Sequence, residues 1–105
     1  MFVIDNFLLN LKVTIQECLN NNPKSQKELY EKYSKTIMHA CERFFKHTDQ
    51  INDAFQQSVI SVFNKLDQFD ESRGEFGSWS YKIAINCSLE IIRKNKQLFF
   101  KRFFR

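Results

Sequence analysis

A chain of 105 residues has room for one domain with a single hydrophobic core. Hydrophobic residues make up 43% of the sequence and charged residues 27%, a composition that excludes a disordered segment and is typical of a soluble globular protein. Two glycines and one proline supply little material for turns. We therefore expect a few long helices in place of many short strands.

The net charge of +4 is unevenly distributed along the chain. The last thirteen residues carry six basic side chains and no acidic one, so the preceding part of the chain is net acidic. The basic end is therefore either a contact for a polyanion or a solvated tail.

The residue types also argue against several classes of site. Three widely spaced cysteines without a C-x-x-C pair support neither a disulfide framework nor a zinc site, and they favour a reducing, cytoplasmic setting. His39 and Cys41 would point about 200° apart on one helix and could not chelate a metal together. No glycine-rich phosphate loop, catalytic triad or acidic cluster is evident. We expect no cofactor, no small-molecule substrate and no catalysis.

The N-terminus begins with hydrophobic residues but lacks a basic region and a small-residue cleavage site, so we expect no secretion signal. No run is long and apolar enough to span a bilayer, and we expect no membrane partner.

Apolar residues at helical spacing predict a first helix from Phe2 to about Leu19. Its stripe is Ile4, Phe7, Leu8, Leu11, Ile15, Cys18 and Leu19. After the break NNNPKS, a capping box of Ser25 and Glu28 predicts the start of a second helix. Its apolar side is Leu29, Tyr30, Tyr33, Ile37, Met38, Cys41, Phe44 and Phe45.

Thr48 or Asp49 is the predicted cap of a third helix that runs to about Leu66. Its inward stripe is Ile51, Phe55, Val59, Val62 and Leu66, with Phe63 flanking. The loop DESRGEFG follows, and a fourth helix starts at Phe76 or Ser78 and continues into the basic end, with Trp79, Ile83, Cys87 and Ile91 inward. The predicted fold is an all-α compact bundle of about four helices with one ordered loop before the last helix.

The outer side of the third helix carries an unusual stripe of amides around an exposed isoleucine. Surface helices normally fill such positions with Lys and Glu, so this stripe is more typical of a docking face. Ordinary surface residues are the alternative interpretation. The members are Asp53, Gln56, Gln57, Ile60 and Asn64.

Three signatures follow one another between Asp49 and Lys96. The first is Asp53-x-x-Gln56 followed by Val59, Ile60, Val62 and Phe63; the second is LDQF leading to Phe76-x-x-Trp79; the third is Ile83-Ala84-x-Asn86 followed by Glu90, Arg93 and Lys94. In order and spacing they resemble region 2 of the sigma-70 family, specifically the small alternative (extracytoplasmic-function) sigma factors. The chain departs from the usual pattern at Gln57, Phe63 and Ser80.

The resemblance covers residues 22–97, and with the first helix, residues 1–21, it defines one domain over residues 1–97. Residues 98–105 form a basic and aromatic extension, a candidate start of a linker to a second domain. In this extension, LFFKRFF, phenylalanines 99, 100, 103 and 104 would share one helix face opposite Lys101, Arg102 and Arg105. Such a pattern suits burial against a partner or a membrane surface.

The resemblance implies a transcription initiation domain with two activities. In the family, the helix with the Asp-x-x-Gln signature docks on the clamp helices of the largest subunit of core RNA polymerase, a role that would fall to the amide stripe. The family also recognises and melts the promoter −10 element by capturing a base of the non-template strand beside the last helix. An anti-sigma factor is a further implied partner.

Base capture needs flexible backbone, aromatic surface, hydrogen-bond donors and cations. The sequence offers them around the loop, with Gly74 and Gly77 expected to permit tight conformations. The residues implied in DNA binding are Arg73, Gly74, Ser78, Lys82, Asn86, Arg93 and Lys94.

Several alternatives stay open at this point. Trp79 is either a core anchor or a stacking platform, Asn86 contacts either DNA or the bundle, and Arg93 is expected to pair with Glu90. The whole chain could also be a helical adaptor that binds polymerase or an anti-sigma factor without opening DNA.

Overall fold

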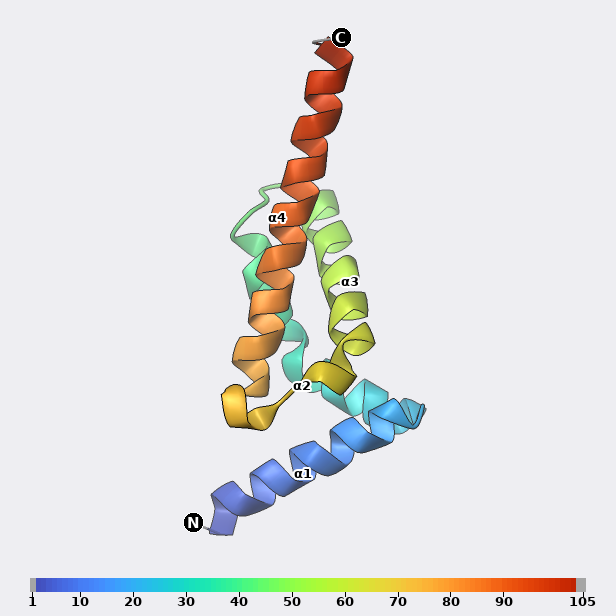
Figure 1. Ribbon diagram of the computed structural model, residues 1–105, viewed down its shortest axis with the longest axis vertical. Helices are drawn as coiled ribbons and strands as arrows, with labels where there is room; N and C mark the ends of the chain where they lie inside the picture. The colour runs from blue at the N-terminus through green and yellow to red at the C-terminus, as the bar shows by residue number, and fades with distance from the viewer. Residues whose placement is uncertain (1, 104–105) are drawn as a thin grey trace.

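The chain folds into a helical bundle in which every described element is helical (Figure 1). The computed structural model describes the backbone of residues 2–103 and the side chains of residues 10–103. The elements in this part are α1 (Phe2–Leu19), α2 (Pro23–Glu42), α3 (Thr48–Asn64), the 3₁₀ turns η1 (Leu66–Gln68) and η2 (Glu71–Arg73), and α4 (Phe76–Phe103). The all-α fold and the loop before the last helix are confirmed.

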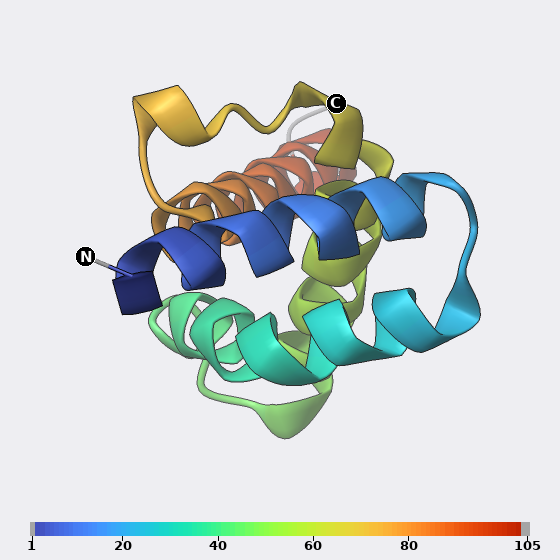
Figure 2. The ribbon, with the colours of Figure 1, turned by 90° about the horizontal axis from the view of Figure 1, so that it is seen from below.

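Helices α2, α3 and α4 pack against one another, and α1 crosses the end of this three-helix unit (Figure 1). Seen from that end, α1 lies between α2 and the loop that precedes α4 (Figure 2). The 28-residue α4 continues past the other end of the bundle, which gives the molecule dimensions of 60 × 27 × 24 Å.

Small side chains occupy the places where the three central helices meet. Ala40, Ala54, Ser58, Ser80 and Ala84 are fully buried, and residues of this size let helix backbones approach closely. Thiol and hydroxyl groups bridge the helices: Cys41 Sγ lies 3.6 Å from Ser58 Oγ, and Cys87 Sγ donates to Ser61 Oγ at 3.3 Å. The three cysteines are free.

The turn into α2 differs from the predicted capping box. Asn22 is the N-cap, with its side-chain oxygen accepting hydrogen bonds from the amides of Lys24 (3.0 Å) and Ser25 (3.3 Å), and Pro23 opens the helix. Ser25 is instead buried, and its hydroxyl donates to Glu17 of α1. The capping-box prediction was wrong for two reasons. Asn22 accepts the amide hydrogen bonds at the start of the helix, and the Ser25 hydroxyl bonds to Glu17 of α1 and does not cap α2.

The start and the inward face of α3 also differ from prediction. Its N-cap is His47, which makes no side-chain capping bond. The helix ends at Asn64, so Leu66 belongs to η1, and its side chain is buried there. The centre of the inward face is Ala54, Ser58 and Val62. The large predicted residues Ile51, Phe55, Val59 and Phe63 are only half-buried.

Most of the other predicted apolar residues lie inside, with two exceptions. Leu19 and Tyr30 are about 40% exposed, and the Tyr30 ring lies edge-on to Phe55 of α3, with ring centroids 6.1 Å apart. The side chains of Ile4, Phe7 and Leu8, also predicted to face the core, lie outside the described residues.

No helix within residues 2–103 combines the length and the apolar character needed to cross a membrane.

Candidate functional site

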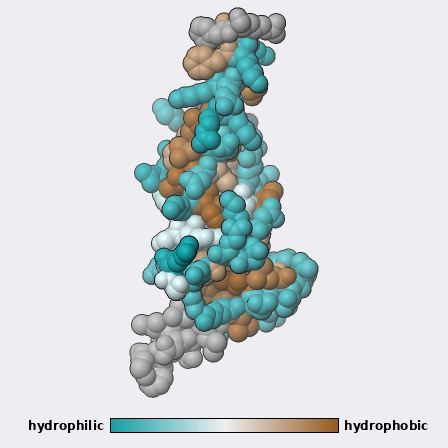
Figure 3. All heavy atoms as spheres, in the orientation of Figure 1, coloured by the Kyte–Doolittle hydropathy of each residue, from teal (hydrophilic) through white to brown (hydrophobic). Residues whose placement is uncertain are grey.

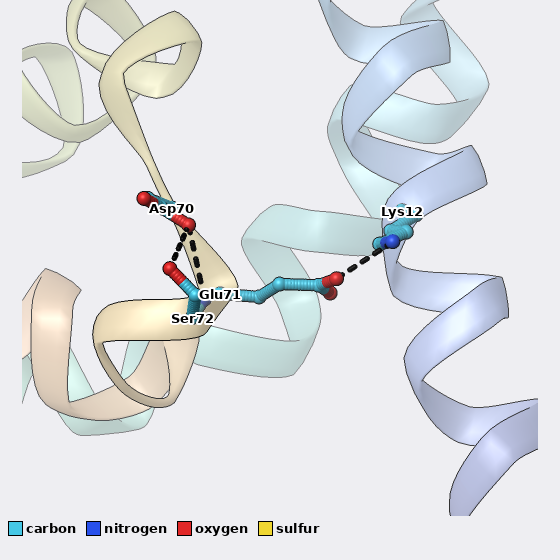
Figure 4. A network of polar contacts seen from close by, with 4 residues as sticks. All are labelled: Lys12, Asp70, Glu71 and Ser72. Carbon is cyan, nitrogen blue, oxygen red and sulfur yellow. Dashed lines mark hydrogen bonds and ion pairs between the residues drawn. The ribbon is translucent and has the colours of Figure 1, made fainter.

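The loop between α3 and α4 is held in a defined shape by its own side chains. The Asp70 carboxylate accepts hydrogen bonds from the Ser72 amide (3.0 Å) and the Ser72 hydroxyl (2.7 Å), which caps η2 (Figure 4). These two bonds, with a smaller contribution from Arg73, lower the pKa of Asp70. Because a lowered pKa favours the charged form, the carboxylate keeps this capping role above the ordinary carboxyl pKa and loses it as the pH falls through the lowered value.

A contact from α1 also reaches this loop. The Lys12 ammonium lies 2.6 Å from the Glu71 carboxylate, and Figure 4 shows the two side chains bridging the space between α1 and η2. This ion pair tethers η2 to α1. Sequence reasoning missed Lys12 because nothing in the local pattern signals a partner so distant along the chain.

Aromatic rings form the base of the loop. The ring centroids of Phe69, Phe76 and Trp79 are 5.1–5.4 Å apart, and Tyr33 of α2 adds a fourth ring 4.6 Å from Phe76. Phe76 is buried, whereas Phe69 and Trp79 are half-buried. Trp79 is thus anchored in the core by these contacts, while part of its ring reaches the surface.

A hollow of about 340 Å³ opens between the loop and the first turns of α4. Four of the seven residues predicted to bind DNA line it: Arg73, Gly74, Ser78 and Lys82. Phe69 and Trp79 also line it, together with Gln68, Asp70 and Glu75. The hollow therefore combines aromatic surface, two cations, two carboxylates and further hydrogen-bonding groups. Gln68 was missed, although it stands beside Phe69 in the LDQF signature.

The two glycines of the loop have different roles. Gly74 has φ +146° and ψ −178°, a conformation that side chains disfavour. Gly77 lies in the first turn of α4 without a positive φ. The expectation that both glycines permit a tight conformation is correct for Gly74 and wrong for Gly77, because α4 begins one residue before Gly77.

A second, larger hollow of about 920 Å³ lies on the other side of the loop, toward α2. Tyr33, Lys32 and Thr36 line it opposite Arg73 and Glu75. Burial, with a smaller effect of the Glu75 charge, raises the pKa of Tyr33, so its phenol keeps its proton and can donate a hydrogen bond. No local pattern in the sequence signals this hollow, because α2 meets the loop only through tertiary packing.

The remaining three residues predicted to bind DNA lie away from the first hollow. Asn86, Arg93 and Lys94 are exposed farther along α4. At 1.5 Å per residue, Arg93 stands roughly 16 Å beyond Lys82 along the helix axis. Arg93 donates to Glu90 at 2.7 Å, as predicted. Asn86 makes no side-chain hydrogen bond within the described part of the chain, so it does not bridge elements of the bundle there.

The outer side of α3 has the composition and exposure that its periodicity predicts. Ile60 is 59% exposed, and the polar members of the stripe are exposed as well. This surface, which we call the α3 stripe, consists of Asp53, Gln56, Gln57, Ile60 and Asn64. Among the described residues, no group of three or more His, Cys, Asp or Glu side chains could hold a metal ion.

Fold and surface together define a small helical domain with an exposed, amide-rich face on one helix and a hollow at the start of another that is lined by aromatic, basic and acidic side chains. The sigma-70 region 2 family model matches residues 29–97, and the chain belongs to this family. This confirms the resemblance noted in the sequence.

Among curated proteins, the chain is similar to the ECF RNA polymerase sigma factor SigW of Bacillus subtilis (strain 168), with 27% identity over 86 residues. The matched part is 82% of this chain and 46% of the relative, so the chain spans about half the length of that protein. No solved structure matches the chain.

Proposed function

We propose that the chain acts in transcription initiation, docking on core RNA polymerase through the α3 stripe and capturing bases of the promoter −10 element beside α4. It acts by binding, without a catalytic step. The observation that carries the proposal is the first hollow, in which four of the residues implied in DNA binding meet an aromatic base.

The hollow has the groups that capture of an extruded base requires. Partly exposed rings of Phe69 and Trp79 provide surface for stacking, and Arg73, Ser78 and Lys82 can donate to base edges or phosphates. Gly74 carries no side chain at the rim, so backbone can approach the base closely. Asn86, Arg93 and Lys94 would hold the strand where it continues along α4. Their phosphate contacts would make the affinity fall steeply with salt.

The α3 stripe suits a partner helix that carries charges. Amide side chains can exchange hydrogen bonds with charged groups without leaving an unpaired charge buried, and Ile60 supplies an apolar centre. We assign this face to the clamp helices of the largest polymerase subunit. An anti-sigma factor that covered the α3 stripe would compete with polymerase, and we include such a regulator among the proposed partners.

A paired substitution tests the docking face. We expect Asp53→Ala with Gln56→Ala to weaken retention of the chain on immobilised core polymerase by at least about tenfold, the effect of losing an interface centre. Both side chains are exposed, so circular dichroism should show unchanged helicity. The matched control is Glu42→Ala with Gln97→Ala, an exposed acid and an exposed amide on α2 and α4, which should bind like the unmodified chain. Equal retention of both double variants would contradict the assignment of this face.

A further inference from the structure

One line of exposed side chains runs along α4 from the hollow to the end of the described helix. Its members recur at alternating intervals of four and three residues, the spacing that keeps side chains on one helix face. They are Lys82, Asn86, Leu89, Arg93, Lys96, Phe100 and Phe103. The first half contains residues already assigned to the DNA strand. We call Lys96, Phe100 and Phe103, which have no assigned role, the extension stripe.

The extension stripe begins at the edge of the bundle, where Lys96 lines a hollow with Phe45 and His47, and continues along the part of α4 that projects beyond the bundle (Figure 1). Phe100 is 57% exposed and Phe103 is 63% exposed. The ring centroid of Phe99 lies 6.0 Å from that of Phe100 and 4.7 Å from that of Phe103, so the rings form one cluster. Figure 3 shows hydrophobic and hydrophilic side chains side by side on this part of the helix.

The charge of this segment has one sign. Residues 93–103 contain five basic side chains and no acidic one. Arg93 pairs with Glu90, whereas Lys94, Lys96, Lys101 and Arg102 form no ion pair within the described residues. The surface is therefore complementary to an anionic partner.

We propose that the extension stripe is a second contact surface for single-stranded nucleic acid, on which bases stack against Phe100 and Phe103 while Lys96 and its basic neighbours bind phosphates. Successive bases on aromatic side chains along a basic track are the general mode of single-strand binding. The inference rests on the proposed function, because the stripe is continuous with the residues assigned to the captured strand. It lengthens the path of the strand on this protein beyond the bundle.

Two other occupants fit the surface less well. A second copy of the chain would bring two segments of the same charge together, which is unfavourable. A lipid surface selects helices whose cations are separated from the apolar face. Here Lys96 stands in line with Phe100 and Phe103, and Arg102 shares a face with Leu98, four residues before it, and with Phe99, three residues before it.

Fluorescence anisotropy with the whole chain and labelled oligothymidylates of about eight and about sixteen nucleotides tests the inference. We expect the longer strand to bind at least about fivefold more tightly, the lower end of the stacking effect of one base. Phe100→Leu with Phe103→Leu removes the rings and keeps the helix apolar; it should abolish this gain and leave binding of the shorter strand unchanged. The control Leu98→Ala, also an exposed apolar residue of α4, should keep the gain.

The outcomes separate this inference from the proposed function. Binding of both strands with equal affinity, or a gain that survives the double substitution, would overturn the extension stripe alone. Failure to bind either strand would overturn base capture as well. Dimerisation in sedimentation velocity, or binding to phosphatidylserine vesicles without a gain from strand length, would assign the phenylalanines to one of the other occupants.

Discussion

Gly74 and Gly77 stand three residues apart, yet their backbones meet different requirements. A Cβ atom added to Gly74 would meet nothing within 4 Å, so only its positive φ disfavours a side chain. A Cβ atom added to Gly77 would lie 3.8 Å from Tyr33 Cε1, an ordinary contact, on a helical backbone. The loop therefore needs glycine for conformation at the first position and tolerates a methyl group at the second.

This difference predicts stability changes of opposite sign. Gly74→Ala should lower the free energy of unfolding by about 1 kcal/mol or more, because alanine is strained at this φ. Gly77→Ala should raise it by about 0.5 kcal/mol, because alanine loses less conformational freedom in a helix. Urea denaturation of the two variants measures both changes. A stability loss of the same size at both positions would mean that contacts, and not backbone conformation, decide the outcome.

At the level of single residues, sequence reasoning succeeded where periodicity decides and failed where tertiary partners decide. The exposure of Gln56 and Ile60 follows from their helical spacing relative to the core. The role of Ser25 does not follow from periodicity, because a serine hydroxyl can either cap its own helix or bond to a neighbouring helix. Only the packing of α1 brings Glu17 within reach of Ser25.

Among the elements, α1 lies outside the part of the chain matched by the family model, which begins at residue 29. It nevertheless contacts η1 and lines the second hollow through Leu11. Its ion pair with Glu71 joins it to the turn that carries Arg73. We infer that α1 positions the loop. The shape of the first hollow, between the loop and α4, then depends on a helix that does not line it.

A charge reversal tests this positioning. Lys12→Glu should bring two carboxylates together at η2. The amides of Arg73 and Gly74, which donate hydrogen bonds to backbone carbonyls of this turn, should then exchange their hydrogens faster. The free energy of unfolding should change by no more than about 1 kcal/mol, because the pair is solvent-exposed. Adding Glu71→Lys should restore the slow exchange.

The matched control is Lys27→Glu, which disrupts an exposed pair with Glu31 within α2 and should leave loop exchange unchanged. If hydrogen exchange in the loop did not change with the sign of the charge at residue 12, this result would contradict a positioning role for α1.

The existence of the four helices follows from the 3.6-residue period, which is why the element order could be predicted, although the buried face of α3 is centred on Ala54, Ser58 and Val62 and not on the larger residues of the predicted stripe. The crossing of α1 over the end of the bundle could not, because an amphipathic stripe shows that a helix packs without showing against what or at which angle. Part of the residue set that lines the hollow beside α4 was predicted, but the aromatic base of the loop also includes Tyr33 of α2, which only tertiary packing brings next to Phe76.

In the molecule as a whole, we propose that two surfaces on different helices serve two partners. The α3 stripe is proposed for polymerase, and the hollow with the outer face of α4 is proposed for one DNA strand. An adaptor that only binds polymerase would need the first surface and not the second. Base-selective binding of a single strand is therefore the property that separates the two functions.

The most direct measurement is the affinity of the chain, bound to core polymerase, for fluorescent single-stranded oligonucleotides that differ at one base. We predict retention on polymerase, a preference for one base at one position, and loss of that preference in Arg73→Ala with Lys82→Ala, which removes two groups from the hollow. Retention on polymerase with equal affinity for all four bases would contradict base capture and identify the chain as an adaptor.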